Sequence, residues 1–370
     1  MNDTSKKLTI VLVLKDRAPF TWRWMKYYNK VGLPFKVLIA DGGKDPSVEK
    51  LKDKSLFNNI DYEYVRYPYD KDIPTFLKKL HDTVSMIKTK YAILVDNDDF
   101  HLVEPLSKAV EFLEENSDYM AACGEIYDFR VKPTDTSNEN DDVYGKMTNV
   151  SKILSGHSNT NNTALGRIRF FSEYSADLAH DVVRTEKLKH CCQILVDSNI
   201  TDLQLSDNLM DYLLVTCGKT YKGKGLYMLH QSHLGGLGRV LLNTDPFDWI
   251  MSELWLKDIP IMYSAIAKEI SNLDRIPFSD VYNKVMQYYT CFIIGKNIIK
   301  GRTERKISQK PSKIVTWGRI FNKNNPVRIF LKKTYLYIQK YKEKRRSNRL
   351  IASSPYRQDF EEIMEFLYNK

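Results

Sequence analysis

The first 130 residues alternate apolar, strand-like runs with amphipathic segments, and this alternation most constrains the fold. Leu8–Leu14 is a continuous run of β-favouring residues, typical of a strand buried on both faces of a parallel sheet. Helices are expected at Ala18–Val31 and Thr75–Lys88. Further strands are expected at Phe35–Ala40, Ile60–Arg66, Tyr91–Val95, Met120–Phe129 and Leu226–Gln231. This order predicts an α/β fold with a doubly wound sheet and right-handed crossovers.

The remaining sequence divides the chain into three regions. Lys132–Asn161 is polar and is expected to be a long loop, helices dominate Arg167–Gly225, and Phe247–Ile299 is helical and rich in aromatic residues. We therefore expect one α/β domain over residues 1–240, a helical region over 241–299, and a separate C-terminal arm over 300–370.

The C-terminal arm is set apart by its charge. The whole chain carries a formal charge of +10, but Lys300–Leu350 alone holds 17 basic residues against two acidic ones. The rest of the chain has 39 basic and 44 acidic residues, so the body is slightly acidic. A basic segment of this kind usually meets an anionic partner.

Within the arm, apolar residues from Val327 to Tyr341 recur at helical spacing and are surrounded by Lys and Arg. A basic amphipathic helix favours an anionic membrane surface. The alternatives are that the stripe packs on the protein's own body or that the arm binds nucleic acid. Nothing in the body supports the last alternative, so no nucleic-acid partner is expected.

The location inferred from the sequence is cytoplasmic, at the inner face of the plasma membrane. No run reaches the ~18–20 apolar residues of a membrane-spanning helix, and the N-terminus shows no signal-peptide hydrophobic region. The five cysteines lack a Cys-x-x-Cys spacing, and their number is odd. That pattern argues against a disulfide framework or a structural zinc site and fits a reducing compartment.

Two acidic turns follow expected strands. Asp41-Gly42-Gly43 ends one strand, and Asp96-Asn97-Asp98-Asp99 ends another. Ligands of open α/β sheets bind outside the carboxyl ends of the strands. Three carboxylates in four residues repel one another unless a cation is present, and oxygen ligands suit Mg²⁺ or Mn²⁺. The alternative is an acidic loop that caps the next helix.

Other nucleotide and hydrolase motifs are missing from the sequence. The turn after the first strand, Lys15–Pro19, lacks the glycines of a dinucleotide-binding loop, and no Walker phosphate loop occurs. His-Glu-x-x-His and Gly-x-Ser-x-Gly are absent as well. A dehydrogenase, a zinc peptidase and an α/β-hydrolase are therefore disfavoured.

Together, Leu8–Arg17, Leu38–Gly43 and Leu94–Asp99 resemble the nucleotide-sugar domain of GT-A glycosyltransferases of the family 2 type. Segments between Arg167 and Lys219 are similar to a bacterial subgroup that builds surface polysaccharides. The resemblance covers roughly residues 7–235. It departs from the pattern at Ala40, where the family has an acid, and at Gly43, where it has Ser.

The resemblance implies a GT-A fold, a nucleotide-sugar donor, a divalent Mn or Mg ion and a hydroxyl of a glycan or lipid-linked glycan as acceptor. It places Lys15, Arg17 and Asp41 along the nucleotide. Asp98 would ligate the metal, with Asp96 and Asp99 beside it.

Inverting transfer also needs a carboxylate base, which family 2 enzymes carry at the N-terminus of a later helix. Asp207 is the candidate, with Asp211 one turn on; the alternative for Asp207 is an ordinary acid of a helix's first turn. His230 is a candidate late metal ligand. Gly235–Arg239 is expected to be a loop, with Arg239 reaching the diphosphate if it closes as a lid.

The sequence also leaves smaller assignments and rival functions open. His180 and Asp181 could contact a sugar, or His180 could be structural, and His233 shares the region of His230. The rivals to a transferase are a degenerate domain acting as a glycan-binding scaffold and a sugar nucleotidyltransferase. The latter would normally show a glycine-rich loop after the first strand, which Lys15–Pro19 is not.

Overall fold

The structure is a computed structural model that describes residues 4–133, 142–154, 157–174, 178–233, 246–293, 349, 351–352 and 354–369. Its strands are β1 (Leu8–Leu14), β2 (Lys36–Asp41), β3 (Tyr62–Arg66), β4 (Tyr91–Val95), β5 (Phe100–His101), β6 (Tyr119–Lys132), β7 (Lys146–Leu154), β8 (Val182–Arg184) and β9 (Lys219–Gln231). Its α-helices are α1 (Ala18–Val31), α2 (Ile73–Ser85), α3 (Val103–Glu115), α4 (Ala164–Tyr174), α5 (Thr185–Ser198), α6 (Leu203–Cys217), α8 (Pro246–Ile250), α9 (Glu253–Asp274), α10 (Phe278–Phe292) and α14 (Arg357–Tyr368). Short 3₁₀ helices lie at Thr4–Lys6, Pro46–Lys52 and Lys54–Leu56.

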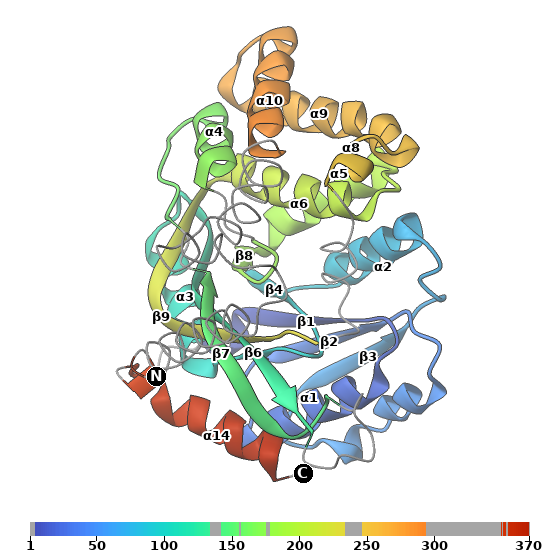
Figure 1. Ribbon diagram of the computed structural model, residues 1–370, viewed down its shortest axis with the longest axis vertical. Coiled ribbons are helices and arrows are strands. Elements are labelled where there is room, and N and C mark those ends of the chain that lie inside the picture. The colour runs from blue at the N-terminus through green and yellow to red at the C-terminus, as the bar shows by residue number, and fades with distance from the viewer. Residues whose placement is uncertain are drawn as a thin grey trace, which may run out of the picture.

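The described residues form one sheet of nine strands, in the order β3-β2-β1-β4-β8-β6-β9-β5, with β7 paired to β6 (Figure 1). The first four of these strands, β3, β2, β1 and β4, are parallel. They form the half of the sheet that we call the parallel half. The predicted α/β fold with buried parallel strands is confirmed, because β1, β2 and β4 are almost entirely buried.

The other half of the sheet is mixed in strand direction. β8 is antiparallel to both β4 and β6, and β5 is antiparallel to β9, while β6 and β9 run parallel. We call the remaining strands, β5 to β9, the mixed half. β8 has three residues and β5 has two, too few for a periodic pattern to identify.

Two long elements of the mixed half also differ from expectation. β7 lies inside Lys132–Asn161, which was expected to be a loop; among the described residues it pairs with β6, and five of its nine residues are polar. β9 begins at Lys219 instead of Leu226, so its first residues, including Gly223 and Gly225, lie in the stretch that was expected to be mainly helical. The remaining long helices and strands lie close to their predicted positions.

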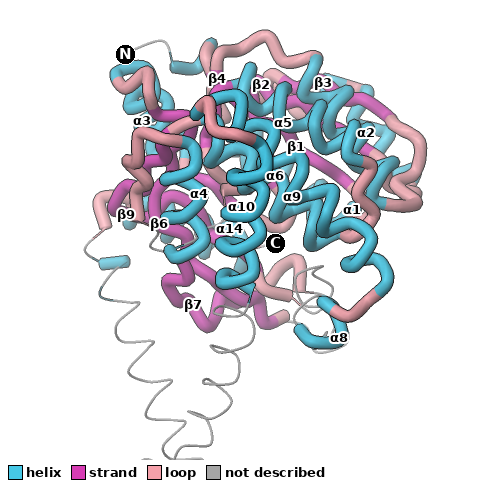
Figure 2. The backbone as a smooth tube through the Cα atoms, turned by 90° about the horizontal axis from the view of Figure 1, so that it is seen from above, coloured by secondary structure: helices cyan, strands magenta, loops and turns pink. Residues whose placement is uncertain are grey.

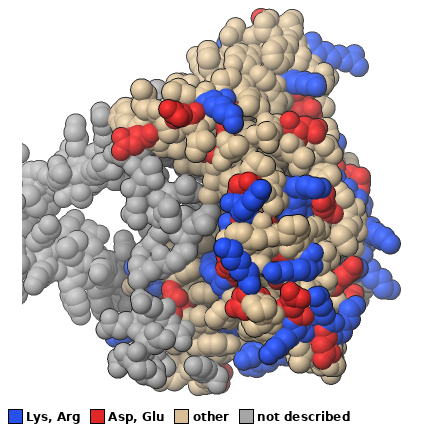
Figure 3. All heavy atoms as spheres, turned by 90° about the vertical axis from the view of Figure 1, so that its right-hand side faces the viewer, with Lys and Arg blue, Asp and Glu red and all other residues tan. Residues whose placement is uncertain are grey.

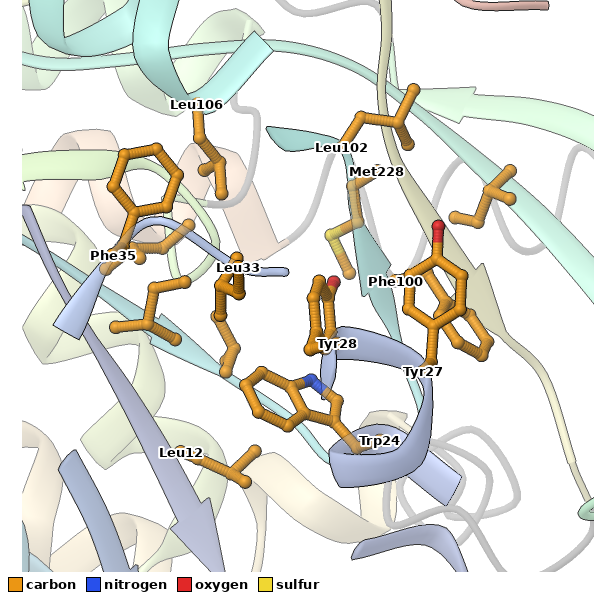
Figure 4. Close-up of a cluster of buried hydrophobic side chains, with 14 of the residues drawn as sticks. Leu12, Trp24, Tyr27, Tyr28, Leu33, Phe35, Phe100, Leu102, Leu106 and Met228 are labelled. Carbon is orange, nitrogen blue, oxygen red and sulfur yellow. The ribbon is translucent and has the colours of Figure 1, made fainter. Parts of the chain in front are cut away.

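Two apolar cores cover the two faces of the sheet. On one face, Trp24, Tyr27 and Tyr28 of α1 pack against Phe100 and Leu102 (Figure 4). On the other face, α2, α5 and α6 build a second core that continues into α9 and α10. Figure 2 shows these helices stacked above the strands. The expected helical region is confirmed for residues 246–293.

The chain returns to the first core at its C-terminal end. Phe360, Ile363 and Leu367 of α14 are buried there, and the backbone N–H of Gly145 donates a hydrogen bond to the Leu367 carbonyl (2.8 Å). The rest of the predicted arm, residues 300–348, lies outside the described residues. On the face drawn in Figure 3, basic and acidic side chains of the described residues are interspersed. Across the part of the chain that the structure describes, no helix is both long and apolar enough for a membrane span.

Candidate functional site

The parallel half brings the predicted turns to one edge of the sheet. β1 lies between β2 and β4, with Leu14 opposite Asp41 and Leu12 opposite Val95. Because the three strands point the same way, the loops that follow them leave from the same edge. Lys15–Arg17, Asp41–Gly43 and Asp96–Asp99 therefore form one site.

The loops after β1 and β2 interlock. Asp16 and Arg17 both adopt left-handed backbone conformations, with φ of 60° and 55°, which L residues seldom take. A Cβ on Gly43 would lie 2.6 Å from the Asp16 nitrogen, and the Asp16 carboxylate accepts a hydrogen bond from the Lys44 N–H (2.7 Å). The two loops touch at this point, which leaves no room for the Ser that the resembled glycosyltransferases carry at the position of Gly43. Two consecutive strained residues are typical of a functional site.

The predicted nucleotide residue Asp41 already has protein partners. It is buried; Oδ1 accepts a hydrogen bond from the Gly43 N–H (2.8 Å), and Oδ2 accepts from Tyr64 Oη (2.7 Å) and Arg66 (2.6 Å). Arg66 also donates to the Gly43 carbonyl (2.6 Å). Asp41 therefore orders the turn and orients Arg66, and its contact with a base or ribose stays a prediction.

Beside this turn, two lysines flank one aromatic ring. The Lys44 ammonium lies 4.1 Å from the centroid of the Tyr69 ring, and the Lys15 ammonium lies 5.4 Å from it. Both lysines are exposed, and Tyr69 is half-buried. An aromatic face between two cations at the ends of β1 and β2 is suited to a planar base and a phosphate group.

In the acidic turn, Asp98 is held by two side chains. Its Oδ2 lies 2.6 Å from Arg17 Nη1 and 2.7 Å from His233 Nε2. Burial alone would raise the pKa of Asp98, but the hydrogen bond from His233 and the charge of Arg17 outweigh burial and hold that pKa well below its usual range. Arg17 and Asp98 were predicted to have separate roles, but the two side chains form an ion pair.

The neighbouring Asp99 contacts the end of β9. His230 Nδ1 lies 3.1 Å from Asp99 Oδ1, which also accepts a hydrogen bond from the Gln231 N–H (2.9 Å). The charge of Asp99 raises the pKa of His230 to about 10, so the ring is protonated at neutral pH. The pairing of β5 with β9 makes this contact, because Phe100 lies opposite Leu229.

One group among the described residues has the composition of a metal site. Ligand atoms of Asp96, Asp99 and His180 all lie within 4.8 Å of one another. The two carboxylates supply the oxygen ligands that Mn²⁺ or Mg²⁺ prefers, so this donor set fits the expected cation. The geometry puts Asp99 and His180 in this group, while Asp98 and His230 lie outside it; their ligand roles stay predictions.

Asp96 is exposed at this edge, yet many protein atoms surround it. That desolvation, followed by the charge of Asp98, raises the pKa of Asp96 to about 6. A raised carboxyl pKa beside other carboxylates indicates a place where bound positive charge would be stabilising.

Arg23 of α1 is a site residue that the sequence did not reveal. It is fully buried, with the guanidinium carbon 4.8 Å from the Phe20 ring centroid, and it donates to the carbonyls of Asp98 (2.7 Å) and Val143 (2.8 Å) and to Gln231 Oε1 (2.5 Å). Burial lowers the pKa of Arg23 to about 10. An arginine between two tryptophans in a helix was the available signal.

The helix expected to begin near Asp207 begins earlier. Asp202 is its N-cap and accepts a hydrogen bond from the Leu205 N–H (2.8 Å), so Asp207 lies in the second turn of α6 and is exposed. Asp211 accepts from the backbone N–H of Leu178 (3.2 Å), two residues before His180. Asp211 thus supports the segment that carries His180, and the base role of either acid stays a prediction.

Two other predicted features can be placed only in part. Gly235–Arg239 lies outside the described residues, so the contact of Arg239 with the diphosphate stays a prediction. Asp181, considered as a sugar contact, is buried and pairs with Lys222 Nζ at 2.7 Å. That pairing makes Asp181 a structural acid.

Comparisons with known proteins add a likeness of fold. No family model and no curated protein matches the chain. A crystal structure of S. aureus TarS 1-349 is 13% identical, with a TM-score of 0.49 over 78% of this chain and 72% of that one. S. aureus TarS itself matches with 13% identity and a TM-score of 0.49 over 80% of this chain and 45% of that one. TarS 1-349 in complex with UDP-GlcNAc matches with 13% identity and a TM-score of 0.47 over 79% and 73%.

Proposed function

We propose that the chain is a GT-A glycosyltransferase that moves a sugar from a nucleotide-sugar donor to a hydroxyl group of a bacterial surface glycan. The observation that carries the proposal is that the loops after β1, β2 and β4 leave from one edge of the sheet. The first two loops bring Lys15 and Lys44 beside the Tyr69 ring, and the third is the acidic turn, which contributes Asp96 and Asp99 to the candidate cation group. This is the arrangement that a nucleoside diphosphate with a divalent ion requires.

The roles of the residues follow from their contacts. Tyr69 and Arg66 would face the base and ribose, with Asp41 orienting Arg66, and Lys15 and Arg17 would neutralise the diphosphate. Asp96, Asp99 and His180 would hold the Mn or Mg ion, which when bound supplies charge stabilisation for the departing phosphate. Asp98, through its ion pair with Arg17, would keep the Arg17 guanidinium directed toward the diphosphate.

An inverting transfer needs a carboxylate that accepts the proton of the acceptor hydroxyl. Asp207 and Asp211 of α6 remain our candidates, and Arg239 remains a candidate diphosphate contact. A base variant, Asp207→Asn, is expected to keep nucleotide binding and to lose transfer. If Asp211→Asn loses sugar transfer while Asp207→Asn keeps it, the base is Asp211 instead.

The nucleotide site is tested by thermal unfolding with UDP, GDP, CMP and dTDP, each with and without Mn²⁺ or Mg²⁺. Binding to the folded state raises the melting temperature by mass action. We expect a rise with one nucleotide that requires metal and disappears in Asp99→Asn, while the exposed Asp197→Asn serves as the control. No rise with any nucleotide would overturn the proposal and favour the non-catalytic scaffold.

A nucleotidyltransferase would use a related site for a different reaction. It joins a nucleoside triphosphate to a sugar phosphate and releases pyrophosphate, whereas a glycosyltransferase releases the nucleoside diphosphate. The left-handed loop at Asp16 and Arg17 is closed against Gly43 and has no glycine-rich cradle for a triphosphate. Release of UDP without pyrophosphate separates the two.

The proposals for the acceptor and for membrane binding depend on the basic arm. We propose that residues 300–350 bind anionic lipid and bring the site to a lipid-linked glycan. Because α14 packs on the first core, deleting the whole C-terminus would also damage the fold. The sharper variant is Lys332→Gln, Lys333→Gln, Lys340→Gln and Lys342→Gln combined. Unchanged sedimentation of this variant with phosphatidylglycerol vesicles would contradict the membrane proposal.

A further inference from the structure

His101 lies directly behind the cation-binding group and is not explained by the roles above. It is the second residue of β5, two positions after Asp99, and it is 2% exposed. Its backbone is clamped from both sides, since its N–H donates to Tyr28 Oη (2.7 Å) and Tyr28 Oη donates to its carbonyl (2.9 Å). The backbone of His101 is therefore held rigidly, which limits where its ring can lie.

The ring of His101 faces His180. The two ring centroids are 5.9 Å apart, and the Tyr227 ring meets His101 edge-on at 5.7 Å. Tyr227 Oη donates a hydrogen bond to the His180 carbonyl (2.9 Å), so the backbone of His180 is fixed to the same wall. His101, Tyr227 and His180 form one packed unit.

Within this unit, polar atoms lack partners. Both ring nitrogens of His101 and Nδ1 of His180 are buried, and none of the three has a hydrogen-bond partner among the described residues. A neutral imidazole has one donor and one acceptor, and leaving them unpaired in a protein interior costs free energy. Buried polar groups too far apart for a direct bond are commonly joined by an ordered water molecule.

We propose that His101 is a positioning residue that, through one water molecule, binds Nδ1 of His180 and so directs Nε2 of His180 toward the cation. Histidines that ligate metals usually donate their other ring N–H to a fixed acceptor, which sets both tautomer and ring orientation. His101 supplies that fixed support from the interior. The proposal rests on the proposed function, because it concerns the same cation site.

The test is Mn²⁺ binding to the full chain, followed by electron paramagnetic resonance in the presence of UDP. Loss of a hydrogen bond of this kind lowers metal affinity by about 10–100-fold. We expect that loss in His101→Phe, affinity within a few-fold of wild type in His101→Gln, which keeps a donor and an acceptor, and no change in the control His190→Phe. His190 is exposed and pairs with Glu269. Nitrogen modulation of the Mn²⁺ spin echo should be present in wild type and absent in His180→Ala.

Melting temperatures of the variants, measured without metal, show whether a variant has lost stability. They therefore separate a folding defect from a loss of metal positioning. Wild-type Mn²⁺ affinity in His101→Phe would overturn the proposal, and so would equal weakening in His101→Phe and His101→Gln, which would indicate packing alone. If wild type binds UDP without Mn²⁺, the inference fails while a metal-independent transferase stands. If it binds neither, both fail.

Discussion

The parallel half and the mixed half of the sheet contribute different things to the site. The parallel half supplies loops that follow long buried strands, with Lys15, Arg17, Asp41 and the acidic turn at their ends. The mixed half supplies His180, His230 and His233. His180 reaches the acidic turn because β8 pairs with β4, and His230 and His233 reach it because β9 pairs with β5. The candidate cation group draws on both halves and lies where they join.

This difference shows that a site's charge can be local in sequence while its ligand set is not. Asp96, Asp98 and Asp99 are within four residues, yet their partners come from two distant segments: Asp96 lies near His180 before β8, while Asp98 meets His233 and Asp99 meets His230 at the end of β9. Changes that separate the two halves should therefore affect the site as strongly as changes in the acidic turn.

The largest expected effect comes from breaking a buried ion pair in either half. Asp70 pairs with Lys79 in the parallel half, and Asp181 pairs with Lys222 in the mixed half, all four side chains being almost fully buried. Removing one partner strands a buried charge, so Asp70→Ala and Asp181→Ala should each lower the free energy of unfolding by about 3–5 kcal/mol. Urea unfolding measures this.

The exposed pair Lys78–Asp82 is the control, and Lys78→Ala should cost no more than about 0.5 kcal/mol. If Asp181→Ala unfolds in two transitions and Asp70→Ala in one, the halves are separate cooperative units. A loss below about 1 kcal/mol in both would contradict the stated burial cost.

Next in size is the loss of sugar transfer when a residue of the cation group is changed. Asp99→Asn from the parallel half and His180→Ala from the mixed half should each slow transfer by about 10²–10³-fold, because the charge that stabilises the departing phosphate is lost. Steady-state kinetics with saturating Mn²⁺ measure the effect. Near-wild-type rates in His180→Ala would mean that the parallel half holds the cation alone.

A smaller effect is expected from Gly43→Ser, which introduces the residue found in the enzymes that the sequence resembles. The new side chain would meet the Asp16 backbone, which cannot move as a flexible side chain can, so we expect about 1–3 kcal/mol of destabilisation and weaker UDP binding. Gly223→Ala in β9 is the matched change, since its Cβ would first meet the Tyr221 ring at 3.2 Å. Equal stability of Gly43→Ser and wild type would show that the interlocked loops can separate.

The smallest effect concerns pH at the outer end of the parallel half. Glu114 is hydrogen-bonded by Lys7 and Lys90 (2.6 Å each) and by Tyr91, and these bonds lower its pKa to about 2. A lowered folded-state pKa stabilises the fold above the ordinary carboxyl pKa and loses that contribution as pH falls toward 2. Glu114→Gln should therefore have a lower free energy of unfolding than wild type at pH 7, by up to about 1 kcal/mol, and this gap should close as the pH falls. A gap that widens in acid would contradict the assignment.

The sequence predicted the parallel half well because three of its four strands, β1, β2 and β4, are almost entirely buried. Leu8–Leu14 and Tyr91–Val95 are continuous apolar runs, and each was placed with the bounds that the structure has. The acidic turn was recognised because it directly follows such a run. The role of Gly43 was not predictable, since only the close approach of Asp16 explains it.

The mixed half was predicted poorly for physical reasons. β8 gains its place by pairing between β4 and β6 over only three residues, and β7 pairs with one neighbour, so neither carries a repeating apolar pattern. His180 therefore could not be assigned to the edge of the sheet from its sequence neighbours. Asp202 was missed as the N-cap of α6, which displaced the expected helix start to Asp207.

Because α14 packs on the body of the protein, residues 294–348 connect two packed helices. The chain enters this segment from α10, which packs in the second core, and re-emerges in α14, which packs in the first core on the opposite face of the sheet. The basic stretch is thus tethered at both ends to one body. A protease cut within it would leave two pieces that stay together through the packing of Phe360, Ile363 and Leu367, and a membrane surface that captured the stretch would pull on both cores at once.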